Sequence, residues 1–380
     1  MRPGMACVLE VLRGEANSRP ILTVEWQDAL HLAEQEAVLP FFIAQMRHSG
    51  APLPDAILDE LTRSEAEQIR NTFMWTSEIR GILQVFAAQS IHVIPLKGPM
   101  LAERIYSSVN LRVSRDLDLL VRRRDLHAAG AALAKLGFIS DSCPSDYDHS
   151  WRRGTTLVEL HFDVVNALDF SFDTAGAWER ALPRQFLGQP VFQFAPSDEL
   201  LFLCIHGVRH RFERLTQVLD IARALQCLAP DIAPTAFEQI QDASLRTIVL
   251  LGRAMAMLLD RRCQPKLTIP ASPATGTHVE ELAGRLWTHL LEHSCEPLDW
   301  QTQHRFYLEI EVTAAGRLRR RIRQLAILAA RLIPADFAFA AQYGVHQTGL
   351  VWAFRQIRLV ARLCGIDLRT KTNRTHSRSQ

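Results

Sequence analysis

The sequence lacks closely spaced cysteines. Its seven cysteines are odd in number, and no Cys-x-x-Cys pair occurs among positions 7, 143, 204, 227, 263, 295 and 364. This spacing is typical neither of a disulfide framework nor of a zinc knuckle, so we expect a protein of the reducing cytoplasm.

The chain also lacks an excess of charge and a long uncharged apolar run. Its net charge of +2 gives no general attraction to nucleic acid or membranes. The most apolar stretch, IRQLAILAARLIPADFAFAA, contains Arg323, Arg331 and Asp336, so we expect no membrane span. The first residues, MRPGMACVLEVLRGE, are too short in apolar length and too charged for a secretory signal.

What is present is a change of hydrophobic period along the chain. Apolar residues recur at helical spacing over residues 25–48 and 54–88, and again almost throughout from Ser197 onward. Between these regions, IHVIPL, RDLDLLV and TTLVELHFDVV read as strands, and PMLAERIYSS and RDLHAAGAALAKLGF read as helices.

This order predicts an α+β fold rather than a doubly wound sheet. We expect a helical region over residues 1–88, a small mixed sheet with helices over 89–195, and a second helical region over 196–368. The polar and basic residues 369–380 are expected to form a disordered tail.

Two acids lie on one face of the second expected strand. Side chains at i and i+2 of a strand point the same way, so Asp116 and Asp118 project together, opposite Leu117 and Leu119. Adjacent carboxylates raise each other's pKa unless a cation lies between them. Glu159 on the next strand is a candidate third ligand, and Asp163 on the same face is the alternative. Carboxylates that converge in this way suit Mg²⁺, and two ions would serve phosphoryl transfer.

A Lys-Gly turn precedes the paired acids. The first strand turns at Gly98 into a helix that starts with Pro99, and such a helix start presents backbone N–H groups to phosphate. Lys97 adds a positive charge beside them. The pattern therefore predicts a nucleotide site at Lys97 and Gly98.

Together, LKGPMLAERIYSSVNLRVSRDLDLLVRRRDLHAAGAALAKLGF and VELHFDV resemble the nucleotidyltransferase core of the DNA polymerase β superfamily. The closer resemblance is to the bacterial family of uncharacterised nucleotidyltransferases, and it extends to LFLCIHGVRHRFERLTQVLDIARAL. It implies Asp116, Asp118 and Glu159 as catalytic metal ligands and Arg112 as a contact of the nucleoside triphosphate. The superfamily has Gly-Ser at the phosphate turn, whereas this chain has Gly98-Pro99, which supplies no side-chain hydroxyl.

Three histidines form weaker candidates. His161 shares the face of Glu159, as a ligand, a base or a surface residue. His206 and His210 lie one turn apart, with Glu213 at i+7 on the same stripe. The resemblance implies a position beside the substrate for these two, and histidines packed at an interface are the alternative.

The combined reading is an Mg²⁺-dependent transfer of a nucleoside monophosphate from an NTP such as ATP, with release of pyrophosphate. The acceptor would be a small molecule, a peptide or a protein. A non-catalytic partner or sensor of the same fold is one alternative. A tRNA- or DNA-end transferase that binds nucleic acid through the basic stretch Arg317–Arg331 is a second, less favoured one.

Overall fold

Four helices open the chain in the computed structural model, which describes residues 2–15, 23–50, 53–140, 147–165, 170, 172–263, 267–293, 300–311 and 318. They are α1 (Pro3–Leu12), α2 (Thr23–Gln35), α3 (Leu39–Ser49) and α4 (Asp55–Ala88). The helical prediction over 25–48 is confirmed, with a break that it did not contain. Ala37 adopts a φ of 55°, which ends α2, and Pro40 lies in the first turn of α3.

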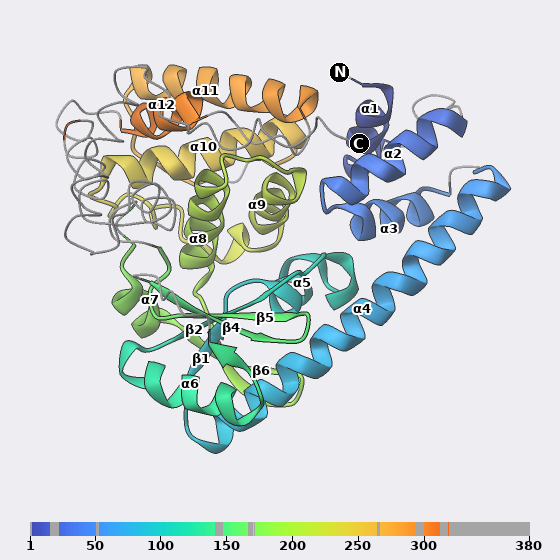
Figure 1. Ribbon diagram of the computed structural model, residues 1–380. Coiled ribbons are helices and arrows are strands. Elements are labelled where there is room, and N and C mark those ends of the chain that lie inside the picture. Colours follow the sequence, from blue (N-terminus) through green and yellow to red (C-terminus); the bar gives the residue numbers. More distant parts are fainter. Residues whose placement is uncertain are drawn as a thin grey trace, which may run out of the picture. The chain divides into compact units, whose positions relative to one another are not determined.

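Helix α4 is one continuous helix of 34 residues, as its period predicted (Figure 1). It packs at its two ends. Ile57 and Leu61 are buried near its start, and Ile79, Leu83 and Phe86 are buried near its end.

The sheet has five strands in the order β1-β2-β5-β4-β3. Strands β2 and β5 are parallel, and every other pair is antiparallel. This sheet, with its flanking helices, confirms the α+β prediction. The bounds are Val93–Pro95 for β1, Leu117–Val121 for β2, Ile139–Ser140 for β3, Asp148–Arg153 for β4 and Thr156–His161 for β5.

Four strands were not predicted. The sequence of β4, DHSWRR, is mostly polar and shows no clean alternation, and β3 has only two residues. The hairpin of β6 (Leu182–Phe186) and β7 (Gln189–Gln193) contains Pro183 and Pro190, which weaken a strand pattern.

The remaining helices flank the sheet or follow it. Around the sheet lie α5 (Gly98–Tyr106), α6 (Leu126–Lys135) and α7 (Thr174–Arg180). The later helices are α8 (Pro196–Arg209), α9 (Leu215–Cys227), α10 (Ala243–Leu259), α11 (Pro273–Glu292) and α12 (Trp300–Ile310). None of the helices in the described ranges is long and apolar enough to cross a membrane. The basic stretch Arg317–Arg331 and the expected tail lie outside the described residues, apart from Leu318.

Two hydrophobic clusters cover the two faces of the sheet. Leu117, Leu119 and Val121 of β2 pack with the end of α4 and with α6. Leu120 faces the other way and belongs to the cluster that contains α5, α8 and α9. In Figure 1 the strands lie between α6 and α8. Asp118 therefore points to the face that α8 covers, because it alternates with Leu117 and Leu119.

Candidate active site

Asp118 and Glu159 lie side by side on neighbouring parallel strands. In the β2–β5 register, Asp118 is opposite Glu159, and Leu117 and Leu119 are opposite Val158 and Leu160. Residues paired in this way point to the same face of the sheet. The pairing brings two carboxylates together from positions that are far apart in the sequence.

Asp116 lies just before this strand. It occupies the bend that leads into β2 and is half-buried, whereas Asp118 is 4% exposed. Burial and then the negative charge of Asp118 raise the pKa of Asp116, and Glu159 acts in the same direction. The three acids therefore act on one another.

Two cationic side chains meet Asp118. The Nζ atom of Lys97 lies 2.9 Å from Oδ2 of Asp118, and Nε2 of His161 lies 3.1 Å from its Oδ1. Burial opposes ionisation, but Lys97 and His161 together hold the pKa of Asp118 well below its usual range.

His161 bridges the two acids. Its Nε2 atom also lies 3.5 Å from Oε2 of Glu159, which is two residues earlier on the same face of β5. Burial lowers the pKa of His161, yet hydrogen bonds to Asp118 and Glu159 raise it to about 9. The imidazole is thus a cation between two carboxylates at neutral pH.

The carboxylates of this cluster suit a divalent cation, and the imidazole of His161 can join them as a ligand only after it loses its proton. One ligand atom each from Asp118, Glu159 and His161 lies within 4.8 Å of the others, and no second such cluster occurs among the residues that the structure describes. Carboxylate oxygens are the preferred ligands of Mg²⁺. The compact trio includes His161 and not Asp116, which differs from the set predicted from sequence.

The glycine turn lies next to these acids. Gly98 has a φ of +66°, a left-handed conformation that glycine adopts without strain, and α5 begins there. The backbone N–H of Leu96 donates to the carbonyl of Asp118 at 3.0 Å, which ties the turn to β2. A Cβ atom on Gly98 would lie 3.7 Å from Oγ of Ser114.

Helix α8 and the residue that follows it bring two histidines to the same face. The rings of His206 and His210 are 4.6 Å apart between centroids. Lost hydration and then the charge of Lys97 hold the pKa of His206 well below its usual range, and Asp118 acts in the opposite direction. His206 therefore lies close enough to interact electrostatically with both members of the Lys97–Asp118 pair.

Two residues of this region were missed in the sequence. Nη2 of Arg209 donates to the hydroxyl of Tyr147 at 2.6 Å, and the Tyr147 and His161 rings are 5.8 Å apart. Tyr147 precedes the unpredicted strand β4, so no pattern marked it. Arg209 lies in the stretch HGVRH, which contains both candidate histidines, and it immediately precedes His210.

Two further candidates have partners of their own. The guanidinium of Arg112 forks onto both carboxylate oxygens of Asp220 in α9 at 2.9 to 3.1 Å. Asp163, the alternative third acid, accepts from the backbone N–H of Val164 at 2.8 Å and from the hydroxyl of Thr174. Asp163 thus caps the end of β5, and Glu159 is the acid that meets Asp118.

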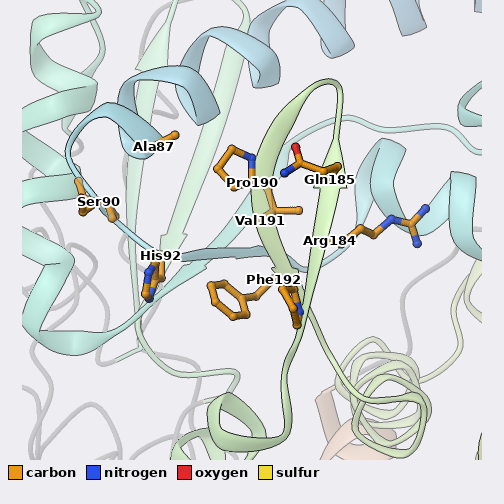
Figure 2. A pocket seen from close by; sticks show the side chains of 10 residues that line it. Ala87, Ser90, His92, Arg184, Gln185, Pro190, Val191 and Phe192 are labelled. Carbon is orange, nitrogen blue, oxygen red and sulfur yellow. The ribbon is translucent and has the colours of Figure 1, made fainter.

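A separate cavity of about 500 Å³ lies beside the β6–β7 hairpin. Figure 2 shows His92 and Phe192 on its wall, with ring centroids 5.0 Å apart. No carboxylate lines this cavity. Its lining does not provide the groups of a metal site.

Comparison with known proteins gives a family match. Residues 23–259, more than half of the chain, match the model of a family described as uncharacterised nucleotidyltransferase. No curated protein matches the chain.

Solved structures give weaker similarities. The crystal structure of ANT(2″)-Ia in complex with adenylyl-2″-tobramycin is 14% identical, with a TM-score of 0.35 over 48% of this chain and 98% of that one. An antigenic nucleotidyltransferase-like protein from Paracoccidioides brasiliensis is 18% identical, with a TM-score of 0.37 over 53% of this chain and 96% of that one.

Proposed function

Because the chain belongs to the uncharacterised nucleotidyltransferase family, we propose that it moves a nucleoside monophosphate from an NTP to an acceptor and releases pyrophosphate. The observation that carries the proposal is the register of Asp118 with Glu159 on two parallel strands. It assembles a carboxylate site beside a glycine turn, which is what an NTP–Mg²⁺ complex requires.

The acids are assigned to the metal. Asp116, Asp118 and Glu159 would hold Mg²⁺, and we propose two ions at this site. When bound, the metal neutralises phosphate charge and stabilises the pyrophosphate that leaves. Lys97 and His161 balance the charge of Asp118 in the protein alone.

The phosphates are assigned to the turn. The first N–H groups of α5 at Gly98 have no partner within the helix, and the positive end of the helix dipole lies there. Lys97 adds a charge at the same point. The guanidinium of Arg112 is bound to Asp220. We therefore assign Arg112 to positioning the segment that leads to Asp116, and not to contacting the nucleoside triphosphate.

The reaction follows from these roles. A hydroxyl or amine of the acceptor attacks the α-phosphorus, and the new bond forms as the bond to the bridging oxygen of pyrophosphate breaks. Pyrophosphate leaves with the electron pair. We assign the acceptor's proton to Glu159, because its side chain is 29% exposed, whereas the side chain of Asp118 is 2% exposed. His206 and His210 border the substrate.

The thiols of Cys204, Cys227 and Cys263 agree with a cytoplasmic setting.

The direct test is pyrophosphate release by the purified chain with Mg²⁺, each of the four NTPs in turn, and a panel of peptide, aminosugar and tRNA acceptors. We expect Asp118→Asn and Glu159→Gln to lower the rate at least about 100-fold. Glu103→Gln, an exposed acid of α5 outside the cluster, serves as the matched control and retains the rate.

Circular dichroism of each variant separates lost chemistry from lost folding. Glu159→Gln is the decisive variant if Asp118→Asn unfolds. Silence of the wild type with every NTP and acceptor, together with no nucleotide binding, would contradict the proposal and favour a non-catalytic partner protein.

A further inference from the structure

The middle of α4 exposes a row of large apolar side chains. Among the described residues between Leu61 and Ile79, Thr72 is the only buried one in this helix. Ile69 is 55% exposed, Phe73 is 73% exposed and Met74 is 61% exposed. Ile69 and Phe73 are one helical turn apart, so they form one apolar stripe. Contiguous exposed apolar surface of this kind marks an interaction site.

Two hollows lie along this stripe. One, of about 710 Å³, lies between α4 and the start of α3 and includes Ile69; the other, of about 780 Å³, lies beside the core and includes Phe73 and Met74. Asn71 and Arg115 line both. We call the two hollows together the α4 groove. Along α4 it runs from Ser64 to Ile82, a rise of about 27 Å.

The groove reaches the candidate active site. Ser114 and Arg115 form part of its wall, and the next residue is Asp116. Oγ of Ser114 lies 3.7 Å from the position of a Cβ atom on Gly98, the residue assigned to phosphate. Because Arg115 lines both hollows, a molecule lying in the groove would pass beside the phosphate turn at the point where the two hollows meet.

The charges of the groove favour a cationic occupant. Its acids are Glu34, Glu65, Glu67 and Glu78, and its bases are Arg115 and Arg153. Glu65 pairs with Arg47, and Glu78 pairs with Arg153. Glu34 and Glu67 have no ion-pair partner among the described residues and remain available.

We propose that the α4 groove binds the acceptor, and that the acceptor is an extended polypeptide segment with apolar and basic side chains. This inference rests on the proposed function. An extended segment of about eight residues matches the length of the groove. Either hollow alone is as large as a small-molecule site of about 300–1,000 Å³, so one small acceptor would fill only one of the two hollows. Nucleic acid would meet the unpaired acids.

Binding of defined probes to the full chain tests the inference without Mg²⁺ or nucleotide. The main probe is a fluorescent peptide of about ten residues in which leucine and lysine alternate, with one serine at its middle. Its matched partner carries glutamate in place of lysine. A single-stranded RNA of similar length and spermine, a small polycation, represent the other classes of ligand.

We expect the lysine peptide to bind and Phe73→Ser to weaken it about tenfold, because an aromatic contact is lost. Ile139→Ser is the matched control: Ile139 is 76% exposed on β3 outside the groove, and its loss should leave binding unchanged. Both side chains are exposed, so neither change should unfold the chain. Glu67→Gln should weaken the lysine peptide and not the glutamate peptide.

Equal binding by wild type and Phe73→Ser would overturn the inference, as would preference for RNA or for the glutamate peptide, or displacement of the lysine peptide by spermine. Pyrophosphate release that proceeds equally in wild type and Phe73→Ser for every acceptor would also overturn it, yet leave the proposed function standing. Peptide binding at Phe73 without any nucleotidyl transfer would contradict the proposed function instead.

Discussion

At the scale of single residues, the carboxylate of Asp118 is neutralised from two sides. Lys97 reaches it from the turn after β1, and His161 reaches it from β5. A buried carboxylate needs such partners, because removal from water disfavours its charged form. The charge of Asp118 is thus balanced within the protein itself.

A second buried acid allows a pH test. Glu199 of α8 is 3% exposed, and Arg104 of α5 lies 2.6 Å from its Oε2. Burial raises the pKa of Glu199 from 4.5 to about 7, although Arg104 opposes this. The folded state therefore holds the proton more tightly than the unfolded state does.

We predict that this side chain stabilises the fold below pH 4.5 and that the contribution is lost as pH rises toward 7. Urea unfolding of wild type and Glu199→Gln at several pH values checks it. The free energy of unfolding of the wild type should fall relative to that of the variant across this range. A difference that is constant with pH would contradict the prediction.

Strand alternation was enough to predict that Asp118 faces away from Leu117 and Leu119, whereas Asp116 lies in the bend before the strand. It could not show that Lys97 and His161 form ion pairs with Asp118, because those contacts depend on which strands are neighbours. Tyr147 and Arg209 were missed for the same reason, because the hydrogen bond that joins them links residues 62 positions apart in the sequence.

At the scale of elements, α9 holds the segment before β2. Arg112, in that segment, forks onto Asp220, and the hydroxyl of Tyr106 in α5 donates to Asp220 at 2.8 Å. The carboxylate of Asp220 is 2% exposed, so these two partners replace the water that it lacks. Three elements are therefore tied at one buried point near Asp116.

Arg112→Met should destabilise the protein by about 3–5 kcal/mol, because it leaves the charge of Asp220 buried with only Tyr106 beside it. The double variant Arg112→Met with Asp220→Leu should recover part of the loss, since no unpaired charge remains. The urea midpoint measures both. A single variant as stable as the wild type would show that the ion pair contributes nothing.

Only some of the helices and strands could be predicted from the sequence. The periods of α4, β2 and β5 were strong because each packs apolar side chains into a hydrophobic cluster. Strand β4 carries polar residues on both faces, and the β6–β7 hairpin contains prolines, so neither gave a period. Their pairing energy comes from neighbours that the local sequence does not contain.

At the scale of the described molecule, the sheet separates two hydrophobic clusters, and the acids lie on the face covered by α8. The α+β class followed from the order of periods along the chain. The parallel pairing of β2 with β5 did not, because a strand's neighbour and direction are set by the whole fold. The exposed middle of α4 also emerged only in three dimensions, since its period continues through the exposed turns.

The central claim is that acids from β2 and the bend before it and from β5 hold a divalent cation beside the glycine turn. Electron paramagnetic resonance of Mn²⁺, titrated into the purified chain with a non-hydrolysable NTP, tests it most directly. We predict saturable binding that weakens at least about tenfold in Glu159→Gln and is unchanged in Glu103→Gln. Mn²⁺ binding of equal strength in the two variants, or none in the wild type, would contradict the account.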